Sequence, residues 1–240
     1  MNKEEFEKIF KQHLKNINIE VNKQQIEMFY KYMNMLLEWN EKINLTAITD
    51  YEEIILKHFV DSLTINKYIE EGSYIVDVGT GAGFPGIPIK ILRYDVTIVL
   101  VDSLNKRIQF LNEVIKELDL KNVKTMHARA EEFGNSKEYR EKFDIATSRA
   151  VANLSTLSEY LIPLIKINGK CICMKGKEIE EELKQAENAI KVLGGKVEKN
   201  EKFELANNSE KRHIIIISKI KETPKKYPRK PGIPSKEPIK

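Results

Sequence analysis

The sequence predicts an α/β fold built on a mostly parallel, seven-stranded sheet, with helices on both faces and an N-terminal helical extension. After Gly72, short β-rich runs alternate with amphipathic stretches, which is the pattern of a parallel sheet covered on both sides. The last two β-rich runs have no helix between them, so we expect an antiparallel hairpin at one edge. The first seventy residues show helical periodicity and no strand pattern.

The N-terminal residues are expected to form a helical cap over residues 1–71. Asn22 and Gln25 match a capping box, and apolar residues then recur at helical spacing as far as Trp39. A further helix is expected over residues 52–69. With 240 residues the chain is close to the ~200–250 at which a single core stops growing. We therefore divide it into this cap, a core domain and a short tail, with bounds 1–71, 72–220 and 221–240.

The core domain is expected to alternate strands with helices. Three helices are expected at residues 104–119, 153–166 and 178–193, the last ended by two glycines. A fourth follows the glycine-rich loop described below. The expected strands cover residues 74–79, 96–103, 123–128, 143–148, 170–175, 196–205 and 213–220.

Composition excludes several classes of protein. No apolar run reaches the ~18 residues that a membrane span needs, and the first residues match neither a secretory signal nor a transit peptide. The only cysteines, Cys171 and Cys173, are two apart and are expected to pack in the core rather than form a disulfide. The four histidines are scattered, so no metal site is expected. We expect a cytoplasmic protein with no membrane partner.

The C-terminal tail is basic and rich in proline. Residues 219–240 contain eight basic and two acidic residues, together with five of the eight prolines. Such a segment is expected to be extended rather than packed. It is either a solvated end or a phosphate-binding arm, with Tyr227 available to stack on a base. The basic candidates for phosphate contacts are Lys225, Lys226, Arg229 and Lys230.

A glycine-rich loop follows the first expected strand. Gly79, Gly81, Gly83 and Gly86 allow a tight turn and close approach to a ligand, and the next helix presents free N–H groups at its start. The spacing matches the dinucleotide fingerprint, with Asp102 ~20 residues further on to bind ribose hydroxyls. A nicotinamide dinucleotide and S-adenosylmethionine are therefore the two candidate ligands.

Asp77 favours S-adenosylmethionine over the dinucleotide. A carboxylate inside the strand before the first glycine suits a cationic ligand better than a pyrophosphate. S-adenosylmethionine carries a sulfonium and an ammonium and has no phosphate. Ala130 and Glu131 follow the third expected strand, where an adenine ring would lie. A sheet whose last strand runs against the others is also typical of methyltransferases that use this cofactor.

Several segments together resemble one known family. They are NLTAI, LKHFVDSL, DVGTGAGFPGIPIKI, VDSLNKRIQFL, RAEEF, SRAVANL and YPRKPGIPSKEPI, and the chain is similar to the RsmG/GidB family over nearly its whole length. The resemblance implies a Rossmann-like class I methyltransferase that methylates N7 of a guanine in the 530 loop of 16S rRNA, position 527 in the usual rRNA numbering. With the residues above, the expected cofactor site comprises Asp77, Gly79, Gly81, Gly83, Phe84, Asp102, Ser103, Ala130, Glu131 and Arg149.

The chemistry of guanine N7 explains the lack of an obvious catalytic acid or base. N7 has a lone pair and no proton to lose, so in-line methyl transfer needs positioning rather than a general base. Arg149, after the fourth strand, is the best candidate to contact the cofactor or the target base. Lys175 is a second positioning candidate and a possible phosphate contact. His58 and Asp61 share a helix face and could form the mouth of the site or a structural pair.

Three other functions are considered. A small-molecule methyltransferase would use the same cofactor, and a non-catalytic ribosome-assembly factor would bind rRNA without transferring a methyl group. An NAD-dependent oxidoreductase is disfavoured by Asp77 and by the lack of a separate substrate domain. The expected partner is 16S rRNA, within the small ribosomal subunit or a precursor, and the chain is expected to be a monomer.

Overall fold

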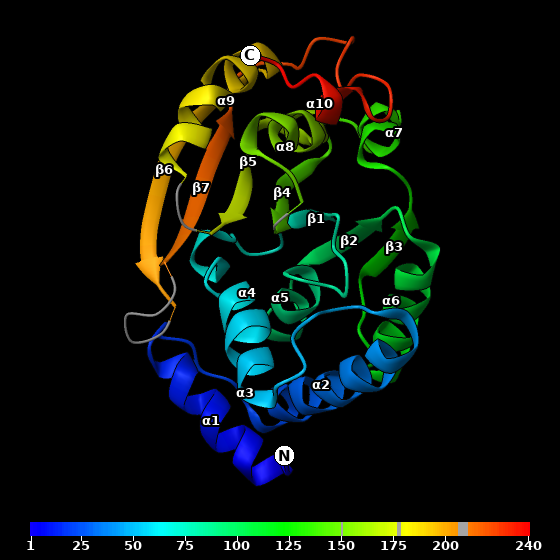
Figure 1. Ribbon diagram of the computed structural model, residues 1–240, viewed down its shortest axis with the longest axis vertical. Coiled ribbons are helices and arrows are strands. Elements are labelled where there is room, and N and C mark those ends of the chain that lie inside the picture. Colours follow the sequence, from blue (N-terminus) through cyan, green and yellow to red (C-terminus); the bar gives the residue numbers. More distant parts are fainter. Residues whose placement is uncertain (150, 177–178, 206–210) are drawn as a thin grey trace.

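The computed structural model describes residues 1–149, 151–176, 179–205 and 211–240, and it confirms the expected α/β fold (Figure 1). The strand order is β3-β2-β1-β4-β5-β7-β6. Strand β7 runs antiparallel to β5 and β6, whereas the pairs on the other side are parallel. The strands are β1 (Tyr74–Val78), β2 (Thr97–Asp102), β3 (Val123–His127), β4 (Phe143–Arg149), β5 (Ile165–Lys175), β6 (Gly195–Glu204) and β7 (Lys211–Lys219).

The helices follow the expected pattern with two corrections. The expected helix over 52–69 is divided into short α, π and 3-10 segments. The expected helix over 153–166 ends at Leu161 in a 3-10 turn because Pro163 cannot donate a backbone hydrogen bond, and Ile165 already belongs to β5. The helices are α1 (Lys3–Lys15), α2 (Lys23–Ile43), α3 (Tyr51–Glu53), η1 (Ile54–Val60), α4 (Asp61–Leu63), η2 (Asn66–Tyr68), α5 (Gly86–Leu92), α6 (Asn105–Glu117), α7 (Ala130–Asn135), α8 (Leu154–Leu161), η3 (Ile162–Leu164), α9 (Glu180–Leu193) and α10 (Ile233–Lys236).

Two hydrophobic cores lie on opposite faces of the sheet. In β2, Ile98 and Leu100 join one core with α1, α2, α5 and α6, whereas Val99 and Val101 join the other with α7, α8 and α9. This alternation is the two-residue period of a strand. The N-terminal helices therefore bury their apolar faces in the same core as one side of the sheet.

Strand β5 carries both cysteines. Cys171 and Cys173 are free thiols, and both are buried in the core beneath α8 and α9, as expected from their spacing. Burial raises the pKa of both thiols. Within the described ranges, no helix combines the length and apolar character that crossing a membrane requires.

The expectation of an extended, unpacked tail is wrong. The tail folds back over α7 and α8 (red in Figure 1), and Tyr227 is buried in the core on that side. The carbonyls of Thr223 and Tyr227 accept hydrogen bonds from the Arg140 guanidinium at 2.8 and 2.6 Å. Proline has no N–H to satisfy, so a proline-rich segment can pack here once neighbouring side chains supply donors to its carbonyls.

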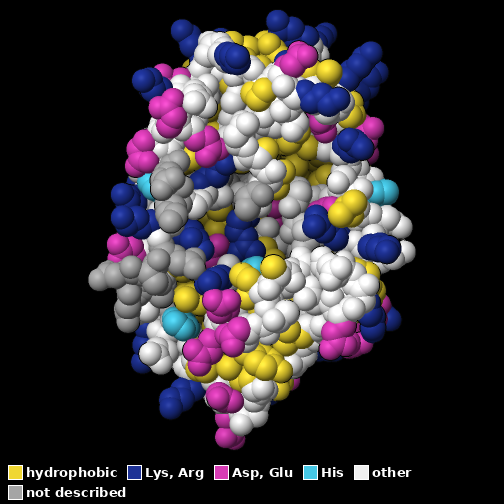
Figure 2. Space-filling model, in the orientation of Figure 1, with side chains coloured by type: hydrophobic (Ala, Val, Ile, Leu, Met, Phe, Trp, Pro, Cys, Tyr) yellow, Lys and Arg dark blue, Asp and Glu magenta, His cyan; other side chains and the backbone are white. Residues whose placement is uncertain are grey.

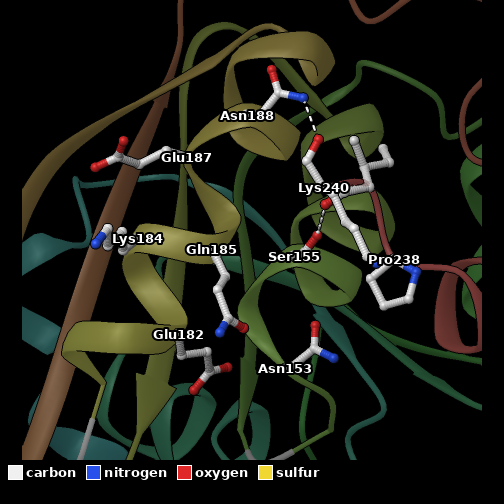
Figure 3. Close-up of a pocket in the computed structure, with 10 residues that line it drawn as sticks. Asn153, Ser155, Glu182, Lys184, Gln185, Glu187, Asn188, Pro238 and Lys240 are labelled. Carbon is white, nitrogen blue, oxygen red and sulfur yellow. Dashed lines mark hydrogen bonds between the residues drawn. The ribbon is translucent and has the colours of Figure 1, made fainter.

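The end of the tail borders a cavity of about 650 Å³ between α8 and α9 (Figure 3). Ser155 donates a hydrogen bond to the carbonyl of Ile239, and Asn188 donates one to the carbonyl of Lys240. The cavity is lined by polar side chains at the start of α8, by polar and charged side chains of α9, and by Pro238, Ile239 and Lys240 of the tail. These contacts fix the last residues of the chain against the domain.

One tyrosine connects the N-terminal helices to the glycine-rich loop. Tyr32 on α2 is fully buried against the rings of Phe59 and Phe84. Its hydroxyl donates a hydrogen bond to the carbonyl of Ala82 in the loop. Burial raises the pKa of Tyr32 well above its usual value, so the hydroxyl keeps its proton and remains a donor.

We predict that Tyr32→Phe lowers the free energy of unfolding by about 1–3 kcal/mol, because it removes the partner of a buried carbonyl. Urea denaturation of both proteins measures the change. Tyr94→Phe is the matched control: Tyr94 is 48% exposed, and the one hydrogen bond of its hydroxyl to the described residues is to the Met28 sulfur at 3.7 Å. Equal losses of stability in the two variants would contradict this role for Tyr32.

Candidate active site

The glycine-rich loop joins β1 to α5 and is held from below by Asp77. One carboxylate oxygen of Asp77 accepts hydrogen bonds from the Thr80 hydroxyl at 2.6 Å and from the Gly86 N–H at 2.9 Å. Asp77 is fully buried, and its other oxygen has no hydrogen-bond partner among the residues that the structure describes. The carboxylate therefore ties the two ends of the loop together from inside the strand.

Gly81 lies at the tip of this loop in a left-handed conformation, with φ +62°. Its N–H donates to Asp102 at 2.9 Å, so the loop is also fixed to the end of β2. A Cβ atom at this position would meet no atom within 4 Å. Glycine thus gives the turn its conformation and leaves space above the loop.

That space is a cavity of about 420 Å³, which we call the loop cavity. A second cavity of about 320 Å³ adjoins it, and we call it the tail cavity because the C-terminal tail forms part of its wall. The two share Gly79, Asp102, Ser103 and Val151. The loop cavity is also lined by Leu45, Thr46, His58, Thr80, Gly81, Ala82, Phe84, Arg107 and Arg149, and the tail cavity by Val78, Val101, Ala128, Arg129, Ala130, Glu131, Tyr160, Gly232 and Ser235.

Asp102 lies at the boundary between these two cavities. It ends β2, and one of its oxygens accepts from the Leu104 N–H at 2.9 Å. The other oxygen accepts from Gly81 and from the Arg107 guanidinium at 3.3 Å. A carboxylate offers about four acceptor positions, so Asp102 keeps capacity for a ligand hydroxyl.

Arg149 ends β4 and forms the opposite wall of the loop cavity. Its guanidinium donates to the Asp61 carboxylate at 3.0 Å, to the Lys57 carbonyl at 2.9 Å and to His58 Nδ1 at 3.1 Å. It also lies over the Phe84 ring, 4.9 Å from the centroid, in a cation–π contact. His58 and Asp61 therefore meet at Arg149 rather than bonding to each other.

The protonation state of His58 follows from these contacts. A guanidinium has only donors, so Nδ1 of His58 accepts from Arg149 and the proton resides on Nε2, which donates to the Thr46 hydroxyl at 2.9 Å. Burial and the nearby charge of Arg149 lower the pKa of His58 to about 3. The ring is therefore neutral at physiological pH, and its basic nitrogen is already occupied.

A third cavity, of about 340 Å³, lies on the other side of Arg149, and we call it the basic cavity. Lys175 ends β5 at its edge, donates to the Ala152 carbonyl at 2.6 Å and forms an ion pair with Glu182. Arg212 forms an ion pair with Asp61 at 3.3 Å. Figure 2 shows Lys and Arg side chains around the hollow in the middle of this face. The cavity is lined by Ile48, Lys57, His58, Asp61, Arg149, Met174, Lys175, Gly176, Phe203, Arg212, His213 and Ile214.

Most of the residues proposed from sequence meet at this edge of the sheet. Asp77 and Gly83 line none of the three cavities; Asp77 fixes the loop, and a Cβ on Gly83 would lie 2.8 Å from the Tyr32 hydroxyl. Arg229 is paired with buried Glu159, so its guanidinium has a partner within the fold. Lys225, Lys226 and Lys230 lie on the tail, outside these cavities.

Some lining residues were not found from the sequence. Tyr160, Gly232 and Ser235 reach the tail cavity because the tail folds back, which its composition did not indicate. Arg212 reaches the basic cavity because β7 is antiparallel and begins where β5 ends. The predicted hairpin could have indicated the position of Arg212, because an antiparallel edge strand starts at the carboxyl edge of the parallel strands.

Comparison with known proteins identifies the family to which this chain belongs. The family model described as GidB, rRNA small subunit methyltransferase G, matches residues 25–215. The chain belongs to this family. The resemblance noted in the sequence is thereby confirmed.

Relatives agree with this assignment over nearly the full length. The chain is 50% identical to a ribosomal RNA small subunit methyltransferase G from Clostridium botulinum, over 98% of this chain and 100% of the relative. It is 52% identical to a protein of the same name from Desulforamulus reducens, over 95% and 96%.

Solved structures agree with the fold. A SAM-dependent methyltransferase from Aquifex aeolicus is similar with a TM-score of 0.55 and 16% identity, covering 73% of this chain and 97% of that chain. M. jannaschii TYW2 in complex with AdoMet is similar with a TM-score of 0.51 and 16% identity, covering 66% and 74%. The expected Rossmann-like methyltransferase fold is confirmed.

We predict that Asp77 makes stability depend on pH between about 4 and 6. Burial raises the pKa of Asp77 to about 6, so the folded state holds this proton more tightly than the unfolded state. This contribution to stability is complete in acid and is lost as the pH rises through that window. The free energy of unfolding of the wild type, minus that of Asp77→Asn, should fall by about 2 kcal/mol from pH 4 to pH 7 in urea titrations.

Asp95→Asn is the control with the opposite sign. Its hydrogen bonds to Arg93 hold the pKa of Asp95 well below the usual range. The wild type should therefore gain stability over Asp95→Asn as the pH rises from acid. A pH-independent difference between the wild type and Asp77→Asn would contradict the role given to Asp77.

Proposed function

We propose that the protein transfers a methyl group from S-adenosylmethionine to N7 of a guanine in the 530 loop of 16S rRNA, position 527 in the usual numbering. The substrate is the small ribosomal subunit or a precursor, and the protein acts as a cytoplasmic monomer. The observation that carries the proposal is the position of Arg149. This side chain separates the loop cavity from the basic cavity, so one residue contacts both spaces. Family membership and the names of the relatives support rRNA as the substrate class.

The loop and tail cavities fit the chemistry of S-adenosylmethionine. Asp102 offers acceptors for ribose hydroxyls at the boundary of the two cavities, and Gly81 leaves open space beside it. Glu131 adds a buried carboxylate in the tail cavity. When bound, the cofactor supplies an electrophilic methyl group on its sulfonium. The residues that would hold it are Gly79, Gly81, Phe84, Asp102, Ser103, Ala130, Glu131 and Arg149.

Positioning, rather than proton transfer, is the task of the protein side chains. Guanine N7 loses no proton on methylation, so the reaction requires no general base. The basic nitrogen of His58 is occupied by Arg149, and Asp61 is paired with Arg149 and Arg212. We assign Arg149 and Lys175 to orienting the target base, because both end neighbouring strands at the basic cavity.

The basic cavity suits a nucleotide with its flanking phosphates. Lys57, Lys175 and Arg212 contribute positive charge to its lining, and Phe203 contributes a ring. Arg and Lys contacts to phosphates position an RNA, while contacts to the base edge specify it. Lys225, Lys226 and Lys230 are exposed on the tail and stay candidates for phosphate contacts at a greater distance.

We predict that 7-methylguanosine at one position of 16S rRNA is lost in cells lacking this gene. Mass spectrometry of rRNA fragments measures the modification after the wild type or a variant is restored. Arg149→Lys should reduce the restored modification at least tenfold, because a lysine cannot reproduce the forked donor geometry of arginine. Arg93→Lys is the matched control, since Arg93 pairs with Asp95 and lines none of the three cavities.

The alternatives give different results in the same experiment. An unchanged modification pattern in cells lacking the gene would overturn the rRNA assignment and favour a small-molecule methyltransferase. If purified protein binds the rRNA but transfers no methyl group from S-adenosylmethionine, the chain is a non-catalytic assembly factor. Full modification by Arg149→Lys would contradict the role given to Arg149.

A further inference from the structure

We propose that the C-terminal tail, residues 221–240, forms one wall of the adenosine part of the cofactor site, so that docking of the tail and binding of the cofactor stabilise each other. This inference rests on the proposed function for the identity of the cofactor. It gives the tail a role that is distinct from that of a phosphate-binding arm.

The wall consists of residues from two distant parts of the chain. Ser103 and Glu131 line one side of the tail cavity, and Gly232 and Ser235 of the tail line another. The Gly232 N–H donates to Oε1 of Glu131 at 2.8 Å. Glu131 is a residue that the sequence assigns to the adenine. The tail therefore completes the cavity and also fixes the orientation of a ligand-binding side chain.

An ion pair outside the cavity holds the tail in this position. The Arg229 guanidinium contacts both oxygens of Glu159, with Nε at 3.0 Å from one and Nη2 at 2.7 Å from the other. The Arg229 backbone N–H donates to the same carboxylate at 2.7 Å. Glu159 is fully buried on α8, so without Arg229 its charge would be desolvated and unpaired. Arg229 thus acts on the cavity through the position of the tail and lines none of it.

Uncharged side chains also form hydrogen bonds to the tail on both sides of Arg229. The Asn135 side chain donates to the Pro228 carbonyl at 2.9 Å, and the Thr156 hydroxyl donates to the Pro234 carbonyl at 2.9 Å. These two contacts lie on α7 and α8, the helices that also carry Glu131 and Tyr160 of the tail cavity. The tail and the cavity wall are therefore one hydrogen-bonded unit.

Docking of the tail and binding of the cofactor are thermodynamically linked in this arrangement, and the linkage can be measured. If the cofactor binds only the form with the docked tail, then binding must favour docking, and loss of docking must weaken binding by the same factor. Coupling between two such sites is commonly between about 5-fold and 150-fold in affinity. A tail that serves only as an RNA arm would show no such coupling, because its charges would act on phosphates alone.

The test compares two substitutions that remove the same charge from adjacent residues. Arg229→Gln breaks the ion pair with Glu159, whereas Lys230→Gln alters an exposed residue of the tail. Calorimetry with S-adenosylhomocysteine should give a Kd raised about tenfold in Arg229→Gln and changed less than twofold in Lys230→Gln. In a second measurement that needs no variant, S-adenosylhomocysteine should slow tryptic cleavage after Lys226 in the full-length wild type at least threefold.

The outcomes separate this inference from the proposed function. Normal binding by the wild type, with equal Kd values in both variants, overturns the inference and leaves the proposed function intact. Cleavage after Lys226 that is unaffected by saturating S-adenosylhomocysteine also overturns it, and this result needs no variant to fold. Equal loss of rRNA binding in both variants, with cofactor binding unchanged, assigns the tail to RNA instead. Failure of the wild type to bind the probe overturns the proposed function and this inference with it.

Discussion

The arrangement of the site depends on one partly buried guanidinium. Arg149 ends the central strand β4 and donates to the carbonyl of Lys57, to His58 and to Asp61, all on the helical segment that follows the N-terminal helices. It also lies over Phe84 of the glycine-rich loop. Because one planar cation satisfies all of these contacts at once, it fixes the helical cap, the sheet and the loop relative to each other. Arg149 lines the two spaces on either side of it, and a change in its position would break several charge-assisted hydrogen bonds.

Buried carboxylates have a similar role around this centre, and each of them holds two parts of the chain together. Asp77 closes the glycine-rich loop, Asp102 fixes the loop to β2, and Glu159 fixes the tail to α8. Desolvation disfavours an isolated buried charge, so each carboxylate is held by donors that only the folded chain brings together. Asp77 is less completely satisfied than the others: one of its oxygens has no partner within the described ranges, and burial raises its pKa to about 6. The buried carboxylates therefore stabilise the structure of this site in addition to providing groups that can bind a ligand.

Particular elements show where local sequence patterns succeed and fail. The strands were predicted well because each alternates or runs apolar between clear turn residues, and the Asn22–Gln25 capping box forms as expected. The helix over 52–69 was predicted as continuous, but a π segment divides it, and His58 and Phe59 of that segment are buried. The tail was predicted to be extended because it is rich in proline and lysine. Composition reports how much core a segment can build by itself, not whether a preformed surface will accept it.

The sequence by itself determined the parallel sheet, the glycine-rich loop after the first strand, the family and most of the residues at the carboxyl edge of the sheet. These follow from periodicities and spacings of a few residues, which act through local geometry. Only the tertiary structure decided that His58 and Asp61 converge on Arg149, that Arg212 joins them and that Gly232 borders the same cavity as Asp102. Those contacts span from about ninety to more than one hundred residues, and no local pattern encodes them, because they arise where separately folded segments pack against each other.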